Sequence, residues 1–295
     1  MTSNHIKVAT RSSPLALKQV DIFISQCHPI NFPYTIDITP MESDGDSPEH
    51  PQTTKTRFVS ALQTAVVNHT ADVAVHSAKD MSYHEHDDLT IAAFLPRTLA
   101  HDVIVSNVPL PTNMDHITLA TSSPRRISQL QYYTPTWKTQ AIRGNLQTRL
   151  NKLSTDSGCD GLILAHAGID RLGWQHMVRK ILPIEQYVPA PGQGVIAIEC
   201  AKRDTKLCQA LGKLNHQETQ HCIAIERAMA KYLQADCETP FGCHAFLDHG
   251  QTHLALYWEH SPAVIFVDQI ALPTPHSKQL VKHMLSQLAS KGIKL

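Results

Sequence analysis

The stretch ATSSPRRISQL, residues 120–130, repeats a pattern that first occurs as ATRSSPLALKQ at residues 9–19. In both copies apolar residues lead into a Ser-Ser-Pro tripeptide, and apolar residues at helical spacing follow it. Serine is a good N-cap, and proline suits the first helical position because its missing N–H would be unpaired there anyway. Each copy therefore predicts a strand, a tight turn and the start of a helix.

Arginines flank both turns. Arg11 comes just before the first serine pair, and Arg125 and Arg126 come just after the second proline. A helix N-terminus carries unpaired N–H groups and partial positive charge, which favour anions. Two ordinary capped helices would explain the tripeptides alone, but the added arginines favour two anion-binding turns.

Strand-like and helical segments alternate outward from the two turns. The expected strands are 5–10, 34–41, 71–77, 89–95, 117–121, 139–143, 161–165 and 195–199. The expected helices are 15–27, 57–69, 125–133, 145–153 and a long stretch after residue 215. Such alternation predicts mainly parallel sheets with helices on their faces, and ligands then bind at the carboxyl ends of the strands.

The expected fold is α/β, with two α/β domains around a cleft and a smaller C-terminal α+β domain. That third part is strand-rich over residues 245–271 and ends in a helix around 277–290. Residues 42–56 are polar, rich in helix breakers and without periodicity, so they predict a long loop of the kind used as a lid.

Composition limits the function. The chain has 295 residues, enough for two or three domains, and 26 Lys and Arg balance 26 Asp and Glu. Balanced charge argues against a general nucleic-acid binder. With no apolar run of membrane length and no apolar signal core at its N-terminus, the sequence predicts a cytoplasmic protein without a membrane partner.

The cysteines and histidines do not form a familiar metal motif. Seven scattered cysteines lack any CxxC pair, which is typical of neither a zinc site nor a disulfide framework. The one dense histidine cluster, HEHDD at 84–88, has no accompanying motif, so no metal is expected.

Further charged residues fall at the carboxyl ends of expected strands. AVHSAKD at 74–80 ends in Lys79 and Asp80, and AIRGNLQTRL at 141–150 supplies Arg143 and Arg149. Arginine suits bidentate recognition of carboxylates, and an aspartate in such a positive field stays ionised. The pattern predicts a pocket for a polycarboxylate in which one anion can stabilise cationic chemistry.

Together these stretches resemble one family. ATRSSPLAL, AVHSAKD, ATSSPRR, IRGNLQTRL, LAHAGIDRLG, PAPGQGVIAIE, IERAM and DCETPFG resemble the motifs of porphobilinogen deaminases (hydroxymethylbilane synthases), in the same order and over nearly the whole chain. The resemblance implies three domains, of which the first two are like a two-domain periplasmic binding protein. Domain 1 would comprise 1–96 and 194–214, domain 2 would comprise 97–193, and domain 3 would comprise 215–295.

The resemblance also implies a transferase reaction. Four porphobilinogen units would join head to tail into linear hydroxymethylbilane, a tetrapyrrole (haem) precursor, with release of ammonia. A dipyrromethane cofactor would be held as a thioether by Cys237, and Asp80 would be the catalytic carboxylate that stabilises positive charge on pyrrole nitrogens. The resemblance further implies a monomer.

By the same resemblance, other positions would bind substrate and cofactor carboxylates or belong to a lid. The carboxylate-binding positions would be Arg11, Ser13, Ser77, Lys79, Arg125, Arg126, Arg143, Arg149 and Arg171. Lys55 and Phe58 would match the end of the lid.

The chain departs from the family pattern in several places. Asp236 stands before the cofactor cysteine, where the family usually has glycine, and a facing carboxylate would raise the pKa of the Cys237 thiol. Smaller departures are Thr53-Thr54 for a glycine pair, Asp44-Gly45-Asp46 for Arg-Gly-Asp, and Met81-Ser82 for Val-Pro.

Several alternatives stay open at this point. The chain could be a degenerate paralogue, or a non-catalytic protein that holds a small carboxylate in the same cleft. A cysteine hydrolase is a further hypothesis, although His244 is close to Cys237 in sequence only. Cys243, in the same turn, competes with Cys237 as the attachment thiol.

Overall fold

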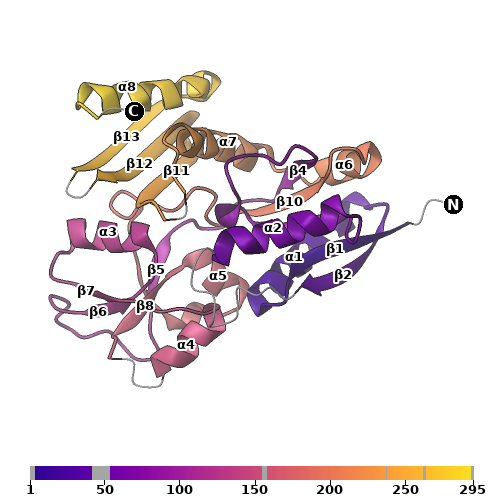
Figure 1. Cartoon of the computed structure of the whole chain (residues 1–295). Helices are drawn as coiled ribbons and strands as arrows, with labels where there is room; N and C mark the ends of the chain where they lie inside the picture. Colours follow the sequence, from indigo (N-terminus) through magenta and orange to yellow (C-terminus); the bar gives the residue numbers. More distant parts are fainter. Residues whose placement is uncertain (1–3, 42–53, 155–157, 237, 262–263, 294–295) are drawn as a thin grey trace. The chain divides into compact units, whose positions relative to one another are not determined.

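The computed structural model describes residues 4–41, 54–154, 158–236, 238–261 and 264–293. The chain divides into two compact units, Met1–Thr98 with Gly194–Gln220 and Leu99–Gln193 with His221–Leu295 (Figure 1). Within the described residues the strands form three sheets, of five, three and five strands. In the same residues no helix is both long and apolar enough to cross a bilayer.

The first unit is built on a mixed sheet. Its strand order is β2 (Thr35–Met41), β1 (His5–Arg11), β3 (Val73–Ser77), β10 (Ile196–Ala201) and β4 (Leu89–Phe94). β1 runs parallel to β2 and β3, whereas β10 runs antiparallel to β3 and β4. The expectation of mainly parallel sheets is therefore wrong for half of these pairings, because the chain returns from the second unit through β10.

Helices cover both faces of this sheet. α1 (Pro14–Cys27) and α6 (Thr205–Gly212) pack on one face, and α2 (Thr54–Val67) packs on the other. Because side chains alternate along a strand, Val8 joins the core under α1 while Ala9 joins the core under α2.

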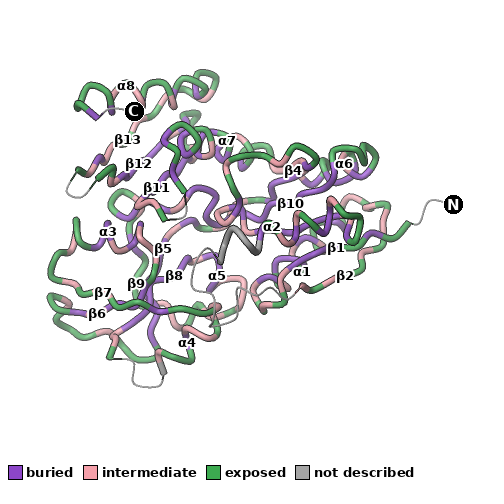
Figure 2. Tube along the Cα trace, in the orientation of Figure 1, coloured by how far each residue is buried: buried purple, intermediate pink, exposed green. Residues whose placement is uncertain are grey.

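The second unit contains a sheet of the same kind. Its order is β7 (Lys138–Gln140), β6 (Thr118–Ala120), β8 (Gly161–Ala165), β5 (Asp102–Val105) and β9 (Val178–Ile181). β6 runs parallel to β7 and β8, and β5 runs antiparallel to β8 and β9. Figure 2 shows β8 buried along its length.

Three helices flank this second sheet. α3 (Pro124–Tyr133) contributes Leu130 to the core on one face. α4 (Leu146–Ser154) and α5 (His166–Arg171) contribute Leu150 and Ile169 to the core on the other face.

The third sheet also belongs to the second unit. It is an antiparallel meander of β11 (Phe241–Asp248), β12 (Gln251–Ser261) and β13 (Val264–Pro273). α8 (Leu280–Ser290) packs on it, and α7 (Gln217–Tyr232) precedes it. Among the residues that the structure describes, the short 3-10 helices are η1 (His28–Ile30), η3 (Ala78–Asp80), η4 (Gln175–Met177) and η5 (Thr274–Gln279).

The expected fold class, two α/β sheets and a smaller C-terminal sheet with helices, is confirmed. β5, β9 and α6 have no counterpart among the elements predicted from sequence, and α2 begins at Thr54 rather than at residue 57. Residues 42–53 of the expected lid lie outside the described residues. The proposed domain boundaries stay a prediction.

Candidate active site

The first Ser-Ser-Pro turn forms the capped helix start that the sequence predicts. Pro14 opens α1, and Ser13 is the N-cap, with its Oγ accepting a hydrogen bond from the Ala16 amide at 3.4 Å. Arg11 is the last residue of β1 and is partly buried. The turn therefore brings a guanidinium and a helix N-terminus to the carboxyl end of β1.

A second set of predicted residues lies at the same edge of this sheet. β3 is parallel to β1 and adjacent to it, so their carboxyl ends meet at one edge. Ser77 ends β3, and its Oγ accepts a 2.7 Å hydrogen bond from Gln19 of α1. The next turn, η3, contains Lys79 and Asp80, both partly buried.

A buried polar pair lies in the sheet just before this turn. The His76 Nε2 and Glu199 Oε2 atoms are 3.1 Å apart, and both side chains are almost completely buried. Gln63 of α2 donates to the other Glu199 oxygen at 3.0 Å. These contacts connect β3, β10 and α2, and they fix the strand that leads into Asp80.

The second Ser-Ser-Pro turn uses its serines differently. Pro124 opens α3, but the side chain of Ser123 makes no capping hydrogen bond. Instead, Ser122 donates to the Ile142 carbonyl at 2.7 Å and accepts from the Ile142 amide at 3.0 Å. The turn is therefore joined to the segment after β7, which leads into Arg143.

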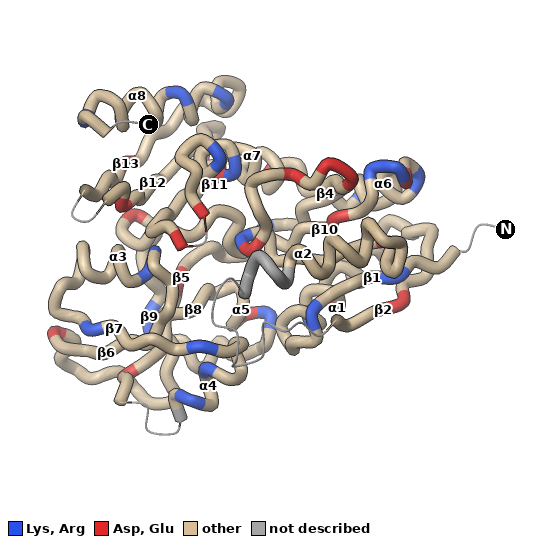
Figure 3. Tube along the Cα trace, viewed as in Figure 1, with Lys and Arg blue, Asp and Glu red and all other residues tan. Residues whose placement is uncertain are grey.

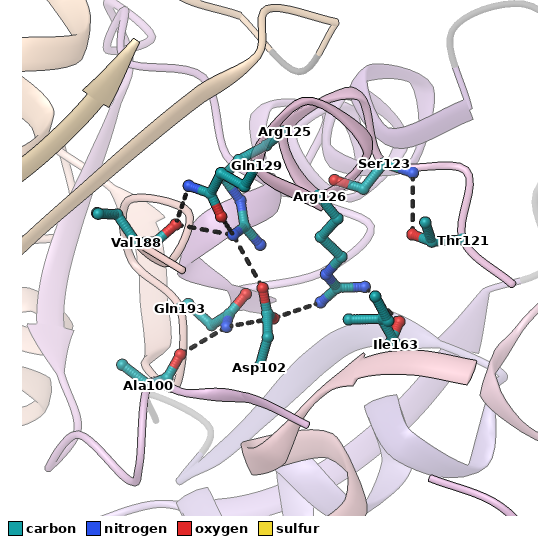
Figure 4. A network of polar contacts seen from close by, with 10 residues as sticks. All are labelled: Ala100, Asp102, Thr121, Ser123, Arg125, Arg126, Gln129, Ile163, Val188 and Gln193. Atoms are coloured by element: carbon teal, nitrogen blue, oxygen red, sulfur yellow. Dashed lines mark hydrogen bonds and ion pairs between the residues drawn. The ribbon is translucent and has the colours of Figure 1, made fainter. Parts of the chain in front are cut away.

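Arg125 and Arg126 both turn toward one buried carboxylate (Figure 4). The side chain of Asp102 is 1% exposed, and its two oxygens lie 2.8 Å from Arg125 Nη1 and 2.7 Å from Arg126 Nη2. Burial alone would raise the pKa of Asp102, but the two guanidiniums and hydrogen bonds from Arg126 and Gln193 hold that pKa well below its ordinary value.

The guanidiniums also bind backbone carbonyls. Arg125 donates to Val188 at 2.8 Å, and Arg126 donates to Ile163 at 2.8 Å. The Nε of Arg126 is buried and has no hydrogen-bond partner within the part of the chain that the structure describes. Arg125 and Arg126 thus bind the carboxylate of Asp102, and the Nε–H of Arg126 is a buried donor that no described residue accepts from.

The PAPGQG turn, residues 189–194, is held from two sides. Gln193 donates to the Ala100 carbonyl at 2.6 Å and to Asp102 at 2.9 Å. Glu226 of α7, which is 0% exposed, accepts from the Gly192 amide at 2.7 Å and from the Ala245 amide at 2.8 Å. One carboxylate therefore fixes α7, this turn and β11 to one another.

β11 approaches the Arg125 network very closely. The Val188 carbonyl that Arg125 binds also accepts from Gln129 at 2.9 Å. A Cβ added to Gly242 would lie only 2.5 Å from that carbonyl oxygen. Glycine is thus required where the strand after the predicted cofactor turn meets Val188.

The predicted cofactor residue Cys237 lies outside the described residues, but its neighbours form an ordered turn. Oδ1 of Asp236 accepts hydrogen bonds from the Glu238 amide and the Thr239 amide, both at 2.9 Å, and from the Thr239 hydroxyl at 2.8 Å. Burial acts to raise the pKa of Asp236, but these hydrogen bonds outweigh it and lower the pKa. This carboxylate serves as the cap of its own turn.

The remaining arginines lie near the carboxyl ends of β7 and β8. Arg143 is exposed after β7, and Arg149 of α4 donates from Nε to the Gly144 carbonyl at 2.8 Å. Arg171 ends α5, and burial lowers its pKa to about 10, an effect that Asp170 partly offsets. Arg171 therefore remains cationic at neutral pH. Figure 3 shows the basic residues on and beside α4.

The predicted residues divide into two sets, one in each unit. The first set comprises Arg11, Ser13, Ser77, Lys79 and Asp80. The second set comprises Arg125, Arg126, Arg143, Arg149 and Arg171. The backbone of Lys55 and Phe58 lies in the first turns of α2, and their side chains are not among those described.

Asp102, Gln193 and Glu226 were not predicted. A signal for two of them exists, because Asp102 opens the apolar run DVIV and Glu226 interrupts the apolar helix CIAIERAMA. A charge in a fully apolar context is buried only when it is paired. Among the described residues, no group of three or more His, Cys, Asp or Glu side chains suits a metal ion.

Comparisons with known proteins agree on one family. Residues 6–209 match the family model described as porphobilinogen deaminase, dipyromethane cofactor binding domain. The porphobilinogen deaminase of Coxiella burnetii (strain RSA 493 / Nine Mile phase I) is 37% identical over 254 residues, which cover 84% of this chain and 82% of the relative. That of Dichelobacter nodosus is 39% identical over 249 residues, covering 82% and 81%.

The solved structures that match the chain are more distant. The periplasmic VFT2 domain of Bordetella pertussis BvgS has 16% identity and a TM-score of 0.43, covering 72% of this chain and 86% of that chain. The methionine binding protein MetQ has 11% identity and a TM-score of 0.43, covering 77% and 94%.

Proposed function

The chain belongs to the porphobilinogen deaminase family, and from that premise we propose which of its residues carry out the family's reaction. It is a transferase, a hydroxymethylbilane synthase, that joins four porphobilinogen units into linear hydroxymethylbilane with release of ammonia. The observation that supports the assignment best is that Asp80, Arg11 and Ser13 all follow or end parallel strands at the same edge of the first sheet.

The cofactor of the family is a dipyrromethane, and we assign its attachment to Cys237. When bound, the dipyrromethane supplies the pyrrole carbon to which the first substrate unit is joined. The rival thiol, Cys243, is completely buried in β11, and its amide is bonded to the Pro189 carbonyl at 2.9 Å. A thiol in that position is a small core residue rather than an accessible nucleophile.

The chain's donors fit a cofactor rich in carboxylates. The arginines of the second unit lie near strand ends, and Arg126 keeps a buried Nε without a partner among the described residues. The Oδ1 atom of Asp236 accepts from the amides of Glu238 and Thr239, so this departure from the family pattern has a structural role in its own turn. Arg125, Arg126, Arg143, Arg149 and Arg171 are the proposed ligands of cofactor and product carboxylates.

Asp80 is the proposed catalytic group. Positive charge develops on a pyrrole nitrogen as ammonia leaves and as the new carbon–carbon bond forms, and a fixed carboxylate stabilises that charge. Arg11, Ser13, Ser77 and Lys79 hold the carboxylates of the incoming substrate so that its nitrogen faces Asp80. Lys55 and Phe58, at the start of α2, would close over the substrate.

Other parts of the proposal concern the whole protein. We propose that the enzyme works as a cytoplasmic monomer on a small-molecule substrate and without nucleic acid. We also propose the three domains 1–96 with 194–214, 97–193, and 215–295. Elution volume in gel filtration with light scattering tests the monomer directly.

The deciding experiment is the intact mass of the purified protein, followed by a peptide map. Cleavage after Glu238 places Cys237 and Cys243 on separate peptides. The proposal expects a dipyrromethane on the peptide that contains Cys237, absent from Cys237→Ala and retained in Cys243→Ala. Pyrroles on Cys243 would overturn the attachment site, and a protein that never acquires pyrroles from porphobilinogen would be a binding protein or a degenerate paralogue.

A further inference from the structure

Two cysteines of the first unit lie in contact without any role in the reaction. The Sγ atoms of Cys200 on β10 and Cys208 on α6 are 3.1 Å apart. Cys200 is 0% exposed, in the core under α1 and α6, whereas Cys208 is partly exposed. Cys208 also donates to the carbonyl of Ala201 at 3.4 Å.

The short connection between the two cysteines is firmly held. Asp204 is the N-cap of α6, and its Oδ1 accepts from the Leu207 amide at 3.0 Å. The Asp204 amide donates to the Ala201 carbonyl at 3.1 Å, which closes the turn after β10. Leu207 and Leu211 anchor the helix in the core beside Cys200. The approach of the two sulfurs is therefore fixed by the fold on both sides.

We propose that Cys200 and Cys208 are a dithiol that a peroxide converts into an intramolecular disulfide. Bond formation requires the sulfurs to move from 3.1 Å to about 2.05 Å, a shift of the order of one ångström. Free cysteines in reducing compartments that do form disulfides are typically transient redox sites.

The chemistry balances with peroxide as the only oxidant. The Cys208 thiolate attacks one peroxide oxygen, the O–O bond breaks, and water leaves after protonation, so that Cys208 carries a sulfenic acid. The sulfur of Cys200 then attacks the Cys208 sulfur, the S–O bond breaks, and the second water leaves with the Cys200 proton. Two thiols and one hydrogen peroxide give one disulfide and two waters.

The two cysteines suit different steps: one reacts with peroxide, and the other attacks the resulting sulfenic acid. Burial, together with the hydrogen bond to Cys208, raises the pKa of Cys200, so Cys200 keeps its proton until an adjacent electrophile forms. Cys208 is the thiol that solvent reaches, so it meets the oxidant first. Cys208 is therefore the attacking thiol and Cys200 the resolving thiol.

The disulfide would lie far from the catalytic edge. Along the β3–β10 ladder, Ile196 pairs with Ser77 at one end and Cys200 pairs with Val73 at the other. Oxidation would therefore fasten α6 to β10 and leave Asp80 undisturbed. We expect an apparent melting temperature higher by a few degrees and a rate of hydroxymethylbilane formation that changes less than about twofold.

The test is a non-reducing peptide map of the holoenzyme after treatment with hydrogen peroxide. Trypsin cuts at Lys202, Arg203 and Lys206, so Cys200 and Cys208 fall on different peptides that only a disulfide can join. We expect a disulfide-linked pair of the Cys200 and Cys208 peptides. Its mass should be two hydrogens less than the sum of the two peptides, and reduction should separate them. Recovery of the two peptides unjoined, or joined to other cysteines, would overturn it.

Matched variants separate the two steps. Cys208→Ser should abolish the cross-link, while Cys159→Ser, which removes another partly exposed thiol, should leave it intact. Cys200→Ala should leave a sulfenic acid on Cys208 that dimedone traps. A dimedone adduct on Cys159 but none on Cys208 would contradict the assigned order. The treated wild-type protein decides the proposal even where a variant fails to fold.

Discussion

At the scale of single residues, the same tripeptide is used in two ways. Ser13 caps α1 as the sequence predicts, whereas Ser123 stands at the cap position of α3 without a capping hydrogen bond. Ser122 is bonded instead to the backbone of Ile142. Helix-start signals are local in sequence. The hydrogen-bond partner of Ser122, however, is Ile142, which follows β7 and lies twenty residues further along the chain.

Asp80 carries the sharpest prediction at this scale. Asp80→Asn keeps the size of the side chain but removes the negative charge, so the rate of hydroxymethylbilane formation should fall by about 10²–10³-fold. The measurement is a steady-state assay on protein shown by mass to carry its cofactor. Asp88→Asn, in the exposed 84–88 loop, is the control and should keep its rate. A nearly normal rate for Asp80→Asn would remove Asp80 from the mechanism.

Asp102 gives a prediction about pH. Its pKa is depressed in the folded protein, so its stabilising contribution is complete above the unfolded pKa of about 3.9 and is lost as pH falls toward the folded pKa. Below about pH 4 the free energy of unfolding should therefore drop by about 1.4 kcal/mol per pH unit through this group alone.

Urea unfolding of Asp102→Asn tests this contribution. At neutral pH the variant should lose about 3–5 kcal/mol, because two buried guanidiniums are left without their anion. It should also lack the one-proton slope in acid that the wild type shows. An acid slope equal to that of the wild type would mean that another carboxylate is responsible.

At the scale of elements, sequence patterns located most strands and helices because apolar periodicity reports burial directly. β5 was missed because DVIV is short and begins with a charge, and β9 because VRKI has mostly exposed side chains. The parallel pairings followed from alternation, but the antiparallel β10 did not. Its direction depends on the chain's return to the first unit, which no local pattern contains.

The residues of the candidate site also differ in whether a local sequence pattern predicts them. Residues at strand ends, such as Asp80 and Arg143, could be predicted because parallel strands end at a common edge. The partners of Glu226 and Gln193 could not be predicted, because they are backbone amides and carbonyls distant in sequence. The ion pair between Arg125 and Asp102 also joins residues that are distant in sequence, so no local pattern predicts it.

Gly242 offers a test of how β11 is positioned. In Gly242→Ala the new Cβ would meet the Val188 oxygen at 2.5 Å, so we expect a loss of about 1–3 kcal/mol in the free energy of unfolding. Gly212→Ala is the matched control, because the nearest atom to its Cβ would be 3.9 Å away. Both are measured by urea unfolding, and equal effects of the two variants would mean that the contact at Val188 is not tight.

At the scale of the whole molecule, the second unit includes the C-terminal sheet. The Tyr257 hydroxyl of β12 is hydrogen-bonded to Ser128 of α3 at 2.6 Å, and burial raises the pKa of Tyr257 to about 12. Val188 and Ala255 pack in the same cluster. The turn that contains Cys237 is thus built on the same body as Arg125 and Arg126.

The three tryptophans provide a probe of this organisation. Trp137, Trp174 and Trp258 all belong to the second unit, so tryptophan fluorescence should report its unfolding alone. Leu62→Ala, in the core of the first unit, should lower a midpoint seen by far-ultraviolet circular dichroism by the equivalent of about 2–5 kcal/mol and leave the fluorescence midpoint unchanged. Leu162→Ala should shift the fluorescence midpoint. A fluorescence shift in both variants would show that the two units unfold as one.

The position of β10 between β3 and β4 has a consequence for biosynthesis. On the ribosome, β4 is complete at Phe94, but the strand it pairs with begins only at Ile196. At ordinary elongation rates the nascent chain waits roughly ten seconds with this edge of the sheet unformed. Translation pauses or chaperones that act while residues 95–195 are being made would therefore decide how much of the enzyme reaches its native state.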